Sequence, residues 1–93
     1  MDFEEKYDKV KNLIDDMKLE EAKMLLEQII SNDDADDKAH YLLGNVFRRG
    51  NNWKQSIDCY SRAIEINPQS PALAAREMAI KILNFYNTDM YNH

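Results

Sequence analysis

Apolar residues recur every three or four positions along most of the chain, in five stretches that short polar segments separate. At this spacing the apolar side chains share one face of a helix, so the pattern predicts five amphipathic α-helices and an all-α fold. The period is clearest in the second stretch, where the predicted helix runs from about Leu19 to Ile30. Its apolar positions are Leu19, Ala22, Leu25, Leu26, Ile29 and Ile30.

Polar residues predict where the first and third helices begin. Asp2, with Glu5 three residues later, has the spacing of a capping box. Residues 16–18 are expected to form the turn after the first helix, although they include no glycine. Asp36 or Asp37, at the end of an acidic linker, is expected to cap the third helix.

A glycine and a cap also predict a helical hairpin in the second half of the chain. Gly50 interrupts the apolar pattern, and Asn52 with Gln55 has the spacing of a capping box for the fourth helix. Two short amphipathic helices joined so tightly are expected to pack antiparallel. Gly44 and Ser56 are both small, so we expect them to let the two backbones approach closely. Such packing would offset the ~0.5–1 kcal/mol that a glycine inside a helix costs relative to alanine.

Residues 38–68 also carry a set of positions with the spacing of a known repeat. The set is His40, Leu43, Gly44, Phe47, Ser56, Tyr60, Ala63 and Pro68. It resembles the tetratricopeptide repeat, a helix–turn–helix unit of about 34 residues with the pattern W-x2-L-G-x2-Y, then A-x3-F, then P. The resemblance implies a right-handed superhelix of antiparallel helix pairs, which presents a groove to another protein.

The first part of the chain is a weaker copy of the same pattern. When it is shifted by one repeat length, Tyr7 aligns with Tyr41 and Leu26 with Tyr60, whereas Val10 aligns with a glycine. We therefore expect a single domain over residues 1–93. Its parts are repeat one at 3–36, repeat two at 37–70 and a capping helix at about 71–87.

The fifth predicted helix lacks the polar outer face of an ordinary terminal helix. Ser70 and Pro71 predict its start, and we expect it to end at Tyr86 or a little beyond. Apolar residues surround most of its circumference, so either residues 87–93 fold back over it or another protein molecule covers it. In the second case a homodimer would form through Ile80, Leu83, Phe85 and Tyr86.

The charge balance bears on the class of partner. The formal net charge of −5 argues against a general nucleic-acid binder. Most of the acidic residues lie within residues 1–37, whereas residues 38–93 carry more basic than acidic side chains. No apolar run reaches the ~18–20 residues of a membrane span, and the charged N-terminal residues are not expected to form a signal peptide. With a single cysteine, the chain is expected to be cytoplasmic and to bind no membrane.

No combination of residues predicts catalysis, a cofactor or a metal site. The chain has two histidines, one cysteine and no glycine-rich phosphate loop, so we expect a non-catalytic protein. The aspartates within residues 33–37 lack the glycine and glutamate spacing of a calcium loop. His40 and Cys59 are expected to be buried or half-buried structural residues.

The resemblance also implies that the first helices of successive repeats line the groove. Five residues are expected to bind a peptide or protein segment there: Lys11, Tyr41, Asn45, Arg48 and Arg76. By the same resemblance, the side chains of Ile14, Ala72 and Ala79 are also expected to face the groove. An asparagine amide can hold a peptide backbone, and an arginine can bind a carboxylate through two parallel hydrogen bonds. Some relatives hold a C-terminal carboxylate with a set of Lys, Asn and Arg residues, but only Arg76 matches that set here.

Overall fold

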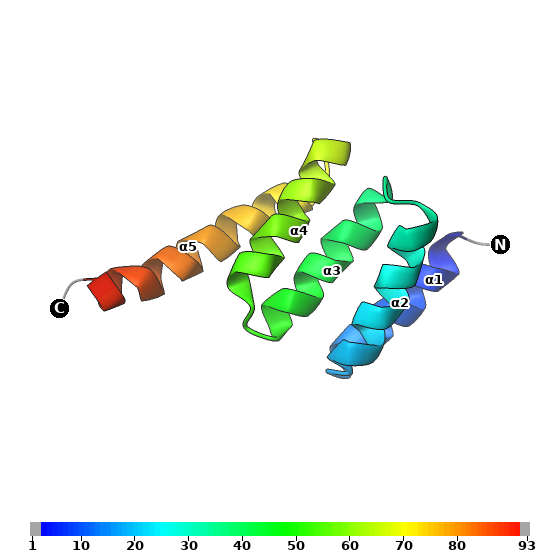
Figure 1. The fold of residues 1–93 in the computed structure, drawn as a ribbon, viewed down its shortest axis with the longest axis horizontal. Coiled ribbons are helices and arrows are strands. Elements are labelled where there is room, and N and C mark those ends of the chain that lie inside the picture. The colour runs from blue at the N-terminus through cyan, green and yellow to red at the C-terminus, as the bar shows by residue number, and fades with distance from the viewer. Residues whose placement is uncertain (1–2, 92–93) are drawn as a thin grey trace.

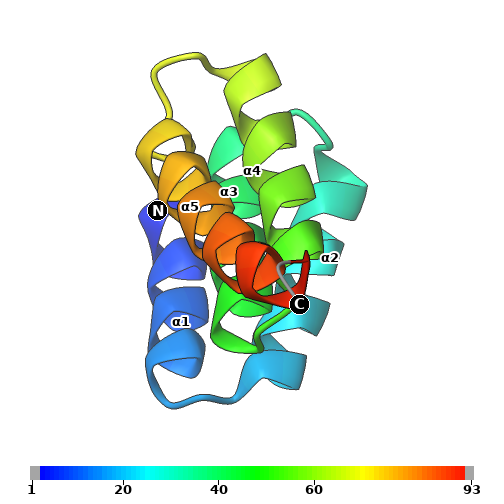
Figure 2. The same cartoon turned by 90° about the vertical axis from the view of Figure 1, so that its left-hand side faces the viewer.

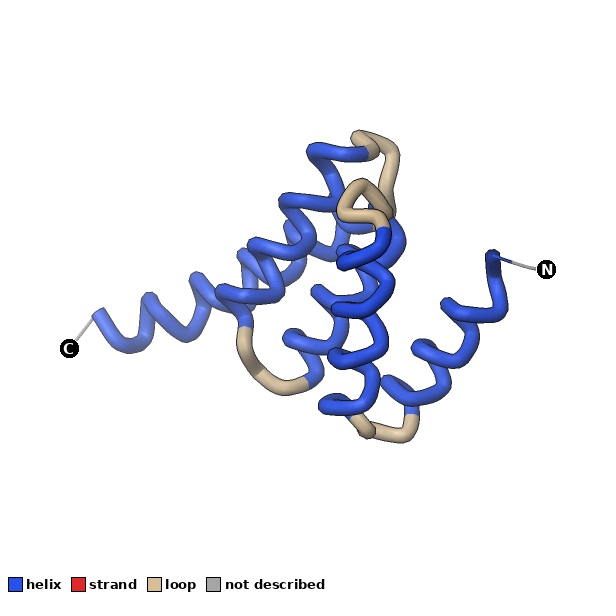
Figure 3. Tube along the Cα trace, turned by 45° about the vertical axis from the view of Figure 1, so that its right-hand side comes forward, coloured by secondary structure: helices blue, strands red, loops and turns tan. Residues whose placement is uncertain are grey.

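The chain folds into five α-helices joined by short loops (Figures 1 and 3). The computed structural model describes the backbone of residues 3–91 and the side chains of residues 5–85, and no strand occurs within that part. The helices are α1 (Phe3–Asp15), α2 (Leu19–Asn32), α3 (Asp37–Arg49), α4 (Trp53–Ile66) and α5 (Ala72–Tyr91). The predicted all-α class and the predicted number of helices are confirmed. Asp2, the expected first cap, lies outside the described residues.

The first two helices recur as the next two at a constant interval. Helices α1 and α3 each contain 13 residues, and α2 and α4 each contain 14. Each bound of α3 and α4 lies 34 residues after the matching bound of α1 and α2. This interval is the repeat length that the sequence pattern predicted.

The turns inside the two helix pairs have the same backbone geometry. Met17 (φ 61°) and Asn51 (φ 65°) occupy matching positions and lie in the left-handed region. A backbone hydrogen bond of 2.8 Å closes each turn, from Lys18 N to Leu13 O in the first. Asparagine tolerates this conformation better than methionine does, so the first turn is the more strained of the two.

The helix caps were predicted only in part. Asp36 Oδ1 accepts from Ala39 N at 3.0 Å, so the predicted cap of α3 forms. Ser70 Oγ accepts from Ala72 N at 3.0 Å, but α5 begins at Ala72, one residue after the predicted Pro71. The predicted capping box at Asn52 is wrong, because its side chain makes no capping hydrogen bond. With φ −95° and ψ 73°, that backbone is not in the extended conformation that aims a cap side chain at the helix.

Buried apolar side chains form two clusters that meet at α3. The first joins α1, α2 and α3 and contains Val10, Ile14, Ala22, Leu26, Ile29, Ala39, Leu42 and Val46. The second joins α4 and α5 and contains Tyr60, Ala63, Ala72 and Ala79. Tyr41 packs against both clusters, so α3 connects them.

At Gly44, where α3 and α4 approach closely, the side chain that fills the space beside the glycine is not that of Ser56, as we expected. A Cβ atom at Gly44 would overlap the ring of Tyr60 rather than the side chain of Ser56. Ser56 instead donates a hydrogen bond from Oγ to the carbonyl of Gly44 at 2.8 Å. The glycine therefore makes room for a buried aromatic ring, and the serine satisfies the backbone beside it.

Helix α5 is longer than the sequence pattern predicted. It contains 20 residues and continues to Tyr91, so residues 87–91 extend the helix instead of folding back over it. No glycine or proline follows Pro71, so the sequence contains no strong signal to end the helix earlier. Figure 1 shows the C-terminal half of α5 projecting beyond α4, against which the helix packs.

Candidate protein-binding face

The first helices of the two pairs, α1 and α3, pack against each other, and α5 follows in the position of a third first helix. In Figure 2, α1 lies at the left of the molecule and α2 at the right, while α5 crosses in front of α3 and α4. The candidate binding residues come from α1, α3 and α5. Their side chains form three separate groups, which we describe from the N-terminal end.

A cavity of about 260 Å³ lies between α1, α3 and the loop before α5, and we call it the α1–α3 pocket. Lys11 and Tyr41, two of the five predicted binding residues, both line it. Its full lining is Tyr7, Asp8, Lys11, Asp37, Lys38, Tyr41, Leu42, Asn67 and Pro71. The pocket therefore combines aromatic and aliphatic walls with charged groups of both signs.

Tyr7 forms a fixed wall of the α1–α3 pocket. Its hydroxyl donates to Asp36 Oδ2 at 2.6 Å, and the ammonium of Lys38 lies 5.7 Å from the centre of its ring. Burial of the phenol raises its pKa above the ordinary value, and the hydrogen bond to Asp36 and the charges of nearby aspartates raise it further. Tyr7 therefore remains neutral, and its ring is held in place by the carboxylate that caps α3.

A hydrogen bond between α3 and the residue that follows α4 also holds the rim of the α1–α3 pocket in place. Asn67 Nδ2 donates to Asp37 Oδ2 at 3.1 Å, which ties the end of α4 to the start of α3. Asn67 Oδ1 accepts from Gln69 N at 3.1 Å, so both ends of this amide are engaged. The pocket is thus built from elements that hydrogen bonds hold together.

The second group surrounds the hydroxyl of Tyr60. Arg48 Nε donates to this hydroxyl at 3.3 Å, and the hydroxyl in turn donates to Asn45 Oδ1. The rings of Tyr41 and Tyr60 are in contact, with centroids 5.9 Å apart. Because the amide oxygen of Asn45 already accepts a hydrogen bond, Asn45 offers a partner its N–H groups more readily than its oxygen. The sequence did not indicate this role of Tyr60, which is fully buried.

The third group is Arg76 on α5. Its Nη1 donates to Ser61 Oγ on α4 at 3.2 Å. Its Nε is buried and has no hydrogen-bond partner among the described residues. Arg76 therefore lies between α4 and α5 with one donor unsatisfied.

Three residues that the repeat pattern assigned to the groove are core residues instead. Ile14 is 5% exposed, and Ala72 and Ala79 are fully buried. Ile14 belongs to the first apolar cluster and the two alanines to the second. Small side chains on α5 let it pack closely against α4, so these alanines are not exposed on the candidate binding face.

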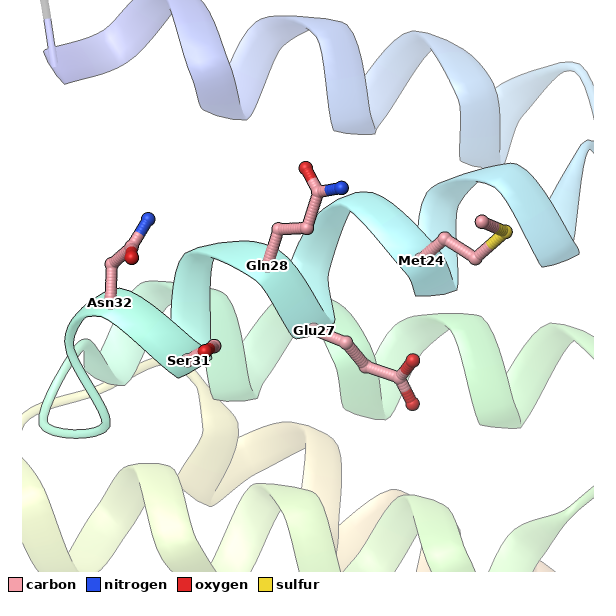
Figure 4. A pocket seen from close by; sticks show the side chains of 5 residues that line it. All are labelled: Met24, Glu27, Gln28, Ser31 and Asn32. Carbon is pink, nitrogen blue, oxygen red and sulfur yellow. The ribbon is translucent and has the colours of Figure 1, made fainter.

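Other hollows lie away from the candidate binding residues. One of them, between α2, α3 and α4, is lined by Glu27, Ile30, Ser31, His40, Leu43, Asp58, Cys59 and Arg62. A second hollow lies along α2 and is lined by Met24, Glu27, Gln28, Ser31 and Asn32. Figure 4 shows that these side chains point in different directions and do not converge on one point. His40, half-buried as predicted, places Nε2 3.0 Å from the carbonyl of Asp34. Within the described residues, no group of three or more His, Cys, Asp or Glu side chains could hold a metal ion. None of the described helices is long and apolar enough to cross a bilayer.

The fold defines a class of protein in which antiparallel helix pairs stack at a fixed repeat length. The family model of the tetratricopeptide repeat matches residues 37–70. The chain is also similar to the Bacteroides fragilis protein BF1650, whose structure was solved by solution NMR. The two share 43% sequence identity over 99% of this chain and 91% of that one, with a TM-score of 0.84. No curated protein matches the sequence.

The chain therefore belongs to the tetratricopeptide repeat family. Repeats of this family generally mediate protein–protein interaction and are generally non-catalytic. The resemblance that the sequence suggested is confirmed.

Proposed function

We propose that the chain is a non-catalytic module that binds an extended segment of another protein along the face formed by α1, α3 and α5. We also propose that this face is built from repeat one at 3–36, repeat two at 37–70 and a capping helix that begins near residue 71. The observation that carries the proposal is the α1–α3 pocket, which lies between the first helices of the two repeats.

The pocket suits one large apolar side chain of the bound segment. Its volume of about 260 Å³ lies just below the range of ~300–1,000 Å³ that is usual for sites that enclose a whole small molecule. The ring of Tyr41 and the side chain of Leu42 supply apolar surface inside it, and Lys11 and Lys38 lie on α1 and α3 beside it. Burial of an apolar side chain there would stabilise the complex by about 25 cal/mol per Å² of surface removed from water.

The remaining candidate residues extend the surface away from the pocket. Asn45 and Arg48 follow Tyr41 along α3, and Arg76 belongs to α5. A segment anchored in the α1–α3 pocket would therefore continue across α3 toward α5. In this arrangement Lys11 and Tyr41 contact the anchoring side chain of the segment. Asn45, Arg48 and Arg76 make polar contacts with the part of the segment that lies beyond the pocket.

The experiment compares protein capture by three forms of the chain. The first is the wild type, the second carries Lys11→Glu and Arg48→Glu, and the third carries Lys18→Glu and Lys54→Glu. The third form undergoes the same change in charge at exposed positions that do not belong to the proposed face. We expect the wild type and the third form to capture the same proteins and the second form to lose them. A synthetic segment of a captured protein should then bind the wild type in a titration, and identical capture by all three forms would reject the proposal.

A second candidate function is self-association through α5. Met78 and Phe85 are 63% and 65% exposed, and at about 100° per residue they lie on the same flank of the helix. Ile80, 37% exposed, lies on the opposite flank, and Leu83 is half-buried. The side chain of Tyr86 lies outside the described residues. Ile80 and Phe85, two of the four residues expected to form a dimer contact, thus do not share one face of the helix, and we assign the proposed contact to Met78 and Phe85.

Sedimentation over a hundredfold range of concentration tests this second candidate. A dimer whose population rises with concentration, and which Met78→Lys with Phe85→Lys abolishes, would support it. Leu73→Lys is the matched control, because Leu73 is an exposed residue on the other flank of α5. A strict monomer at the highest concentration would reject self-association and would leave the groove proposal unaffected.

A further inference from the structure

We infer that α5 of one copy of the chain docks in the hollow between α2, α3 and α4 of a second copy, with Phe85 inside the hollow and Lys81 at its acidic rim. This hollow has a volume of about 440 Å³, and we call it the α2–α4 hollow. The inference rests on the second candidate function, self-association through α5, and names the surface that α5 contacts. It does not involve the α1–α3 pocket.

The α2–α4 hollow lies where the repeat pattern places a large aromatic side chain. The pattern has tryptophan at the position of His40, and an imidazole is smaller than an indole. The His40 ring lines the hollow, and its Nε2 lies 3.0 Å from the carbonyl of Asp34 in the loop between α2 and α3. Leu43 and Cys59, both half-buried, also line the hollow, and its wall is mainly apolar. The hollow can therefore accept an aromatic ring from another molecule.

Two carboxylates on the rim of the hollow are available to a cation. Glu27 on α2 and Asp58 on α4 are exposed, and neither forms an ion pair within the described part of the chain. The cation that lines the hollow, Arg62, lies 3.3 Å from Glu65, so its charge already has a partner. A ligand that carries an apolar group beside a positive charge therefore complements this hollow better than an acidic ligand does.

The outer side of α5 carries side chains with that chemistry. Met78, Lys81 and Phe85 are exposed and lie at positions i, i+3 and i+7, so they form one stripe along the helix. The stripe does not include Ala72 and Ala79, which are buried in the cluster that α5 shares with α4. Because the C-terminal half of α5 projects beyond α4 (Figure 1), the stripe can reach another molecule. It presents a cation between two large apolar side chains.

The charges of the two surfaces favour a second copy of the chain as the occupant. Docking brings Lys81 of one copy to the rim carboxylates of the other and removes the exposed ring of Phe85 from water. Over longer distances, residues 1–37, which supply α2, are mainly acidic, whereas residues 38–93, which supply α5, carry more basic than acidic side chains. Because the contact joins two different surfaces, it closes a dimer only when the α5 helix of each copy occupies the hollow of the other.

The test uses two variants that each keep one half of the contact. His40→Trp fills the hollow with a side chain of the same copy, and it introduces the residue type of the repeat pattern, so we expect it to fold. Met78→Lys with Phe85→Lys removes the apolar stripe of α5 and leaves the hollow open. In sedimentation, each variant alone should associate at least about tenfold more weakly than the wild type. An equal mixture of the two should form a complex that contains one copy of each.

Reversal of charge tests the role of Lys81. Asp58→Lys should weaken self-association severalfold, and the double variant Asp58→Lys with Lys81→Asp should restore it, because the attraction is then re-formed with opposite signs. Glu20→Lys is the matched control, since it makes the same change in charge at an exposed position of α2 that does not line the hollow. It should leave self-association unchanged.

The possible failures of this inference and of the second candidate function differ. A wild type that stays monomeric at the highest concentration would overturn both. Self-association that persists in His40→Trp would overturn the inference alone, because α5 would then contact another surface, such as α5 of the second copy. If His40→Trp does not fold, the charge reversals still decide the question, and either no effect of Asp58→Lys or no rescue by Lys81→Asp would contradict the proposed contact.

Discussion

The contact between Gly44 and Tyr60 leads to the clearest prediction for a single residue. The ring of Tyr60 occupies the space where a Cβ atom at position 44 would lie. We therefore expect Gly44→Ala to lower the free energy of unfolding by about 1–3 kcal/mol, as overpacking of a core does. Urea denaturation would measure the change.

Gly50 provides the matched control for this prediction. A Cβ atom there would have no neighbour closer than 3.6 Å, and Gly50 has a φ of −89°, which alanine adopts readily. Gly50→Ala should therefore change stability by less than about 1 kcal/mol, and in the stabilising direction. Equal effects of the two substitutions would show that Tyr60 does not restrict position 44.

The thiol of Cys59 should react slowly in the folded protein. Burial raises its pKa to about 11, and the charge of Asp58 adds to the shift. At pH 8 only a small fraction of the thiol is therefore ionised, and the thiolate is the reactive form. We expect alkylation by iodoacetamide to be much slower than in urea-unfolded protein and to accelerate as pH rises toward 11. Equal rates in the folded and unfolded states would contradict this.

Two differences from the sequence-based expectations arise from the reach of the Tyr60 side chain. The pattern placed Gly44 and Ser56 on facing helices, and the structure shows that they do make contact. It could not show that a ring one helical turn beyond Ser56 would extend over the glycine and reach Asn45. Helix periodicity predicts which face a residue occupies, but not how far a long side chain extends along that face.

Among the elements, α1 and α3 are linked through the hydrogen bond from Tyr7 to Asp36. Because the pKa of Tyr7 is higher in the folded state than in the unfolded state, folding favours the protonated phenol. The stability that this shift contributes is complete below about pH 10 and is lost as pH rises beyond that value. At neutral pH, Tyr7→Phe should lower stability by about 0.5–1.5 kcal/mol through the lost hydrogen bond.

The pH dependence distinguishes this linkage from a simple packing effect. The difference in stability between the wild type and Tyr7→Phe should become smaller as pH is raised from 8 to 11, because only the wild type loses this contribution. Urea midpoints of both proteins across that range would show the trend. A difference that stays constant with pH would mean that ionisation of Tyr7 is not linked to folding.

The bounds of the elements could be predicted where local signals are strong. Asp36 and Ser70 were recognised from sequence because a cap depends on a side chain and the backbone two or three residues later. The length of α5 was underestimated because a helix without a stop signal can end at many positions with similar energy. The capping box at Asn52 failed because residue type alone does not determine the backbone angles of a turn.

At the scale of the whole molecule, the repeat pattern predicted the arrangement of the helices better than it predicted which side chains are exposed on the candidate binding face. A constant repeat length places α1 and α3 side by side, so the meeting of Lys11 and Tyr41 in one pocket follows from the pattern. The burial of Ala72 and Ala79 does not follow from it, because it depends on how closely α5 approaches α4. The hydrogen bonds of Arg48 and Arg76 also depend on tertiary contacts that no sequence spacing indicates.

The two apolar clusters should unfold together, because Tyr41 of α3 packs against each of them. Trp53, the only tryptophan, packs against the second cluster, so its fluorescence reports on α4 and α5, whereas circular dichroism reports on all helices. Leu26→Ala, in the first cluster, should lower stability by about 2–5 kcal/mol, and Ile29→Val by about 0.5–1.5 kcal/mol. If the molecule is a single cooperative unit, each substitution will shift the fluorescence and circular dichroism transitions by the same amount of urea. A fluorescence midpoint that stays at the wild-type value while the circular dichroism midpoint falls would show instead that the two clusters unfold independently.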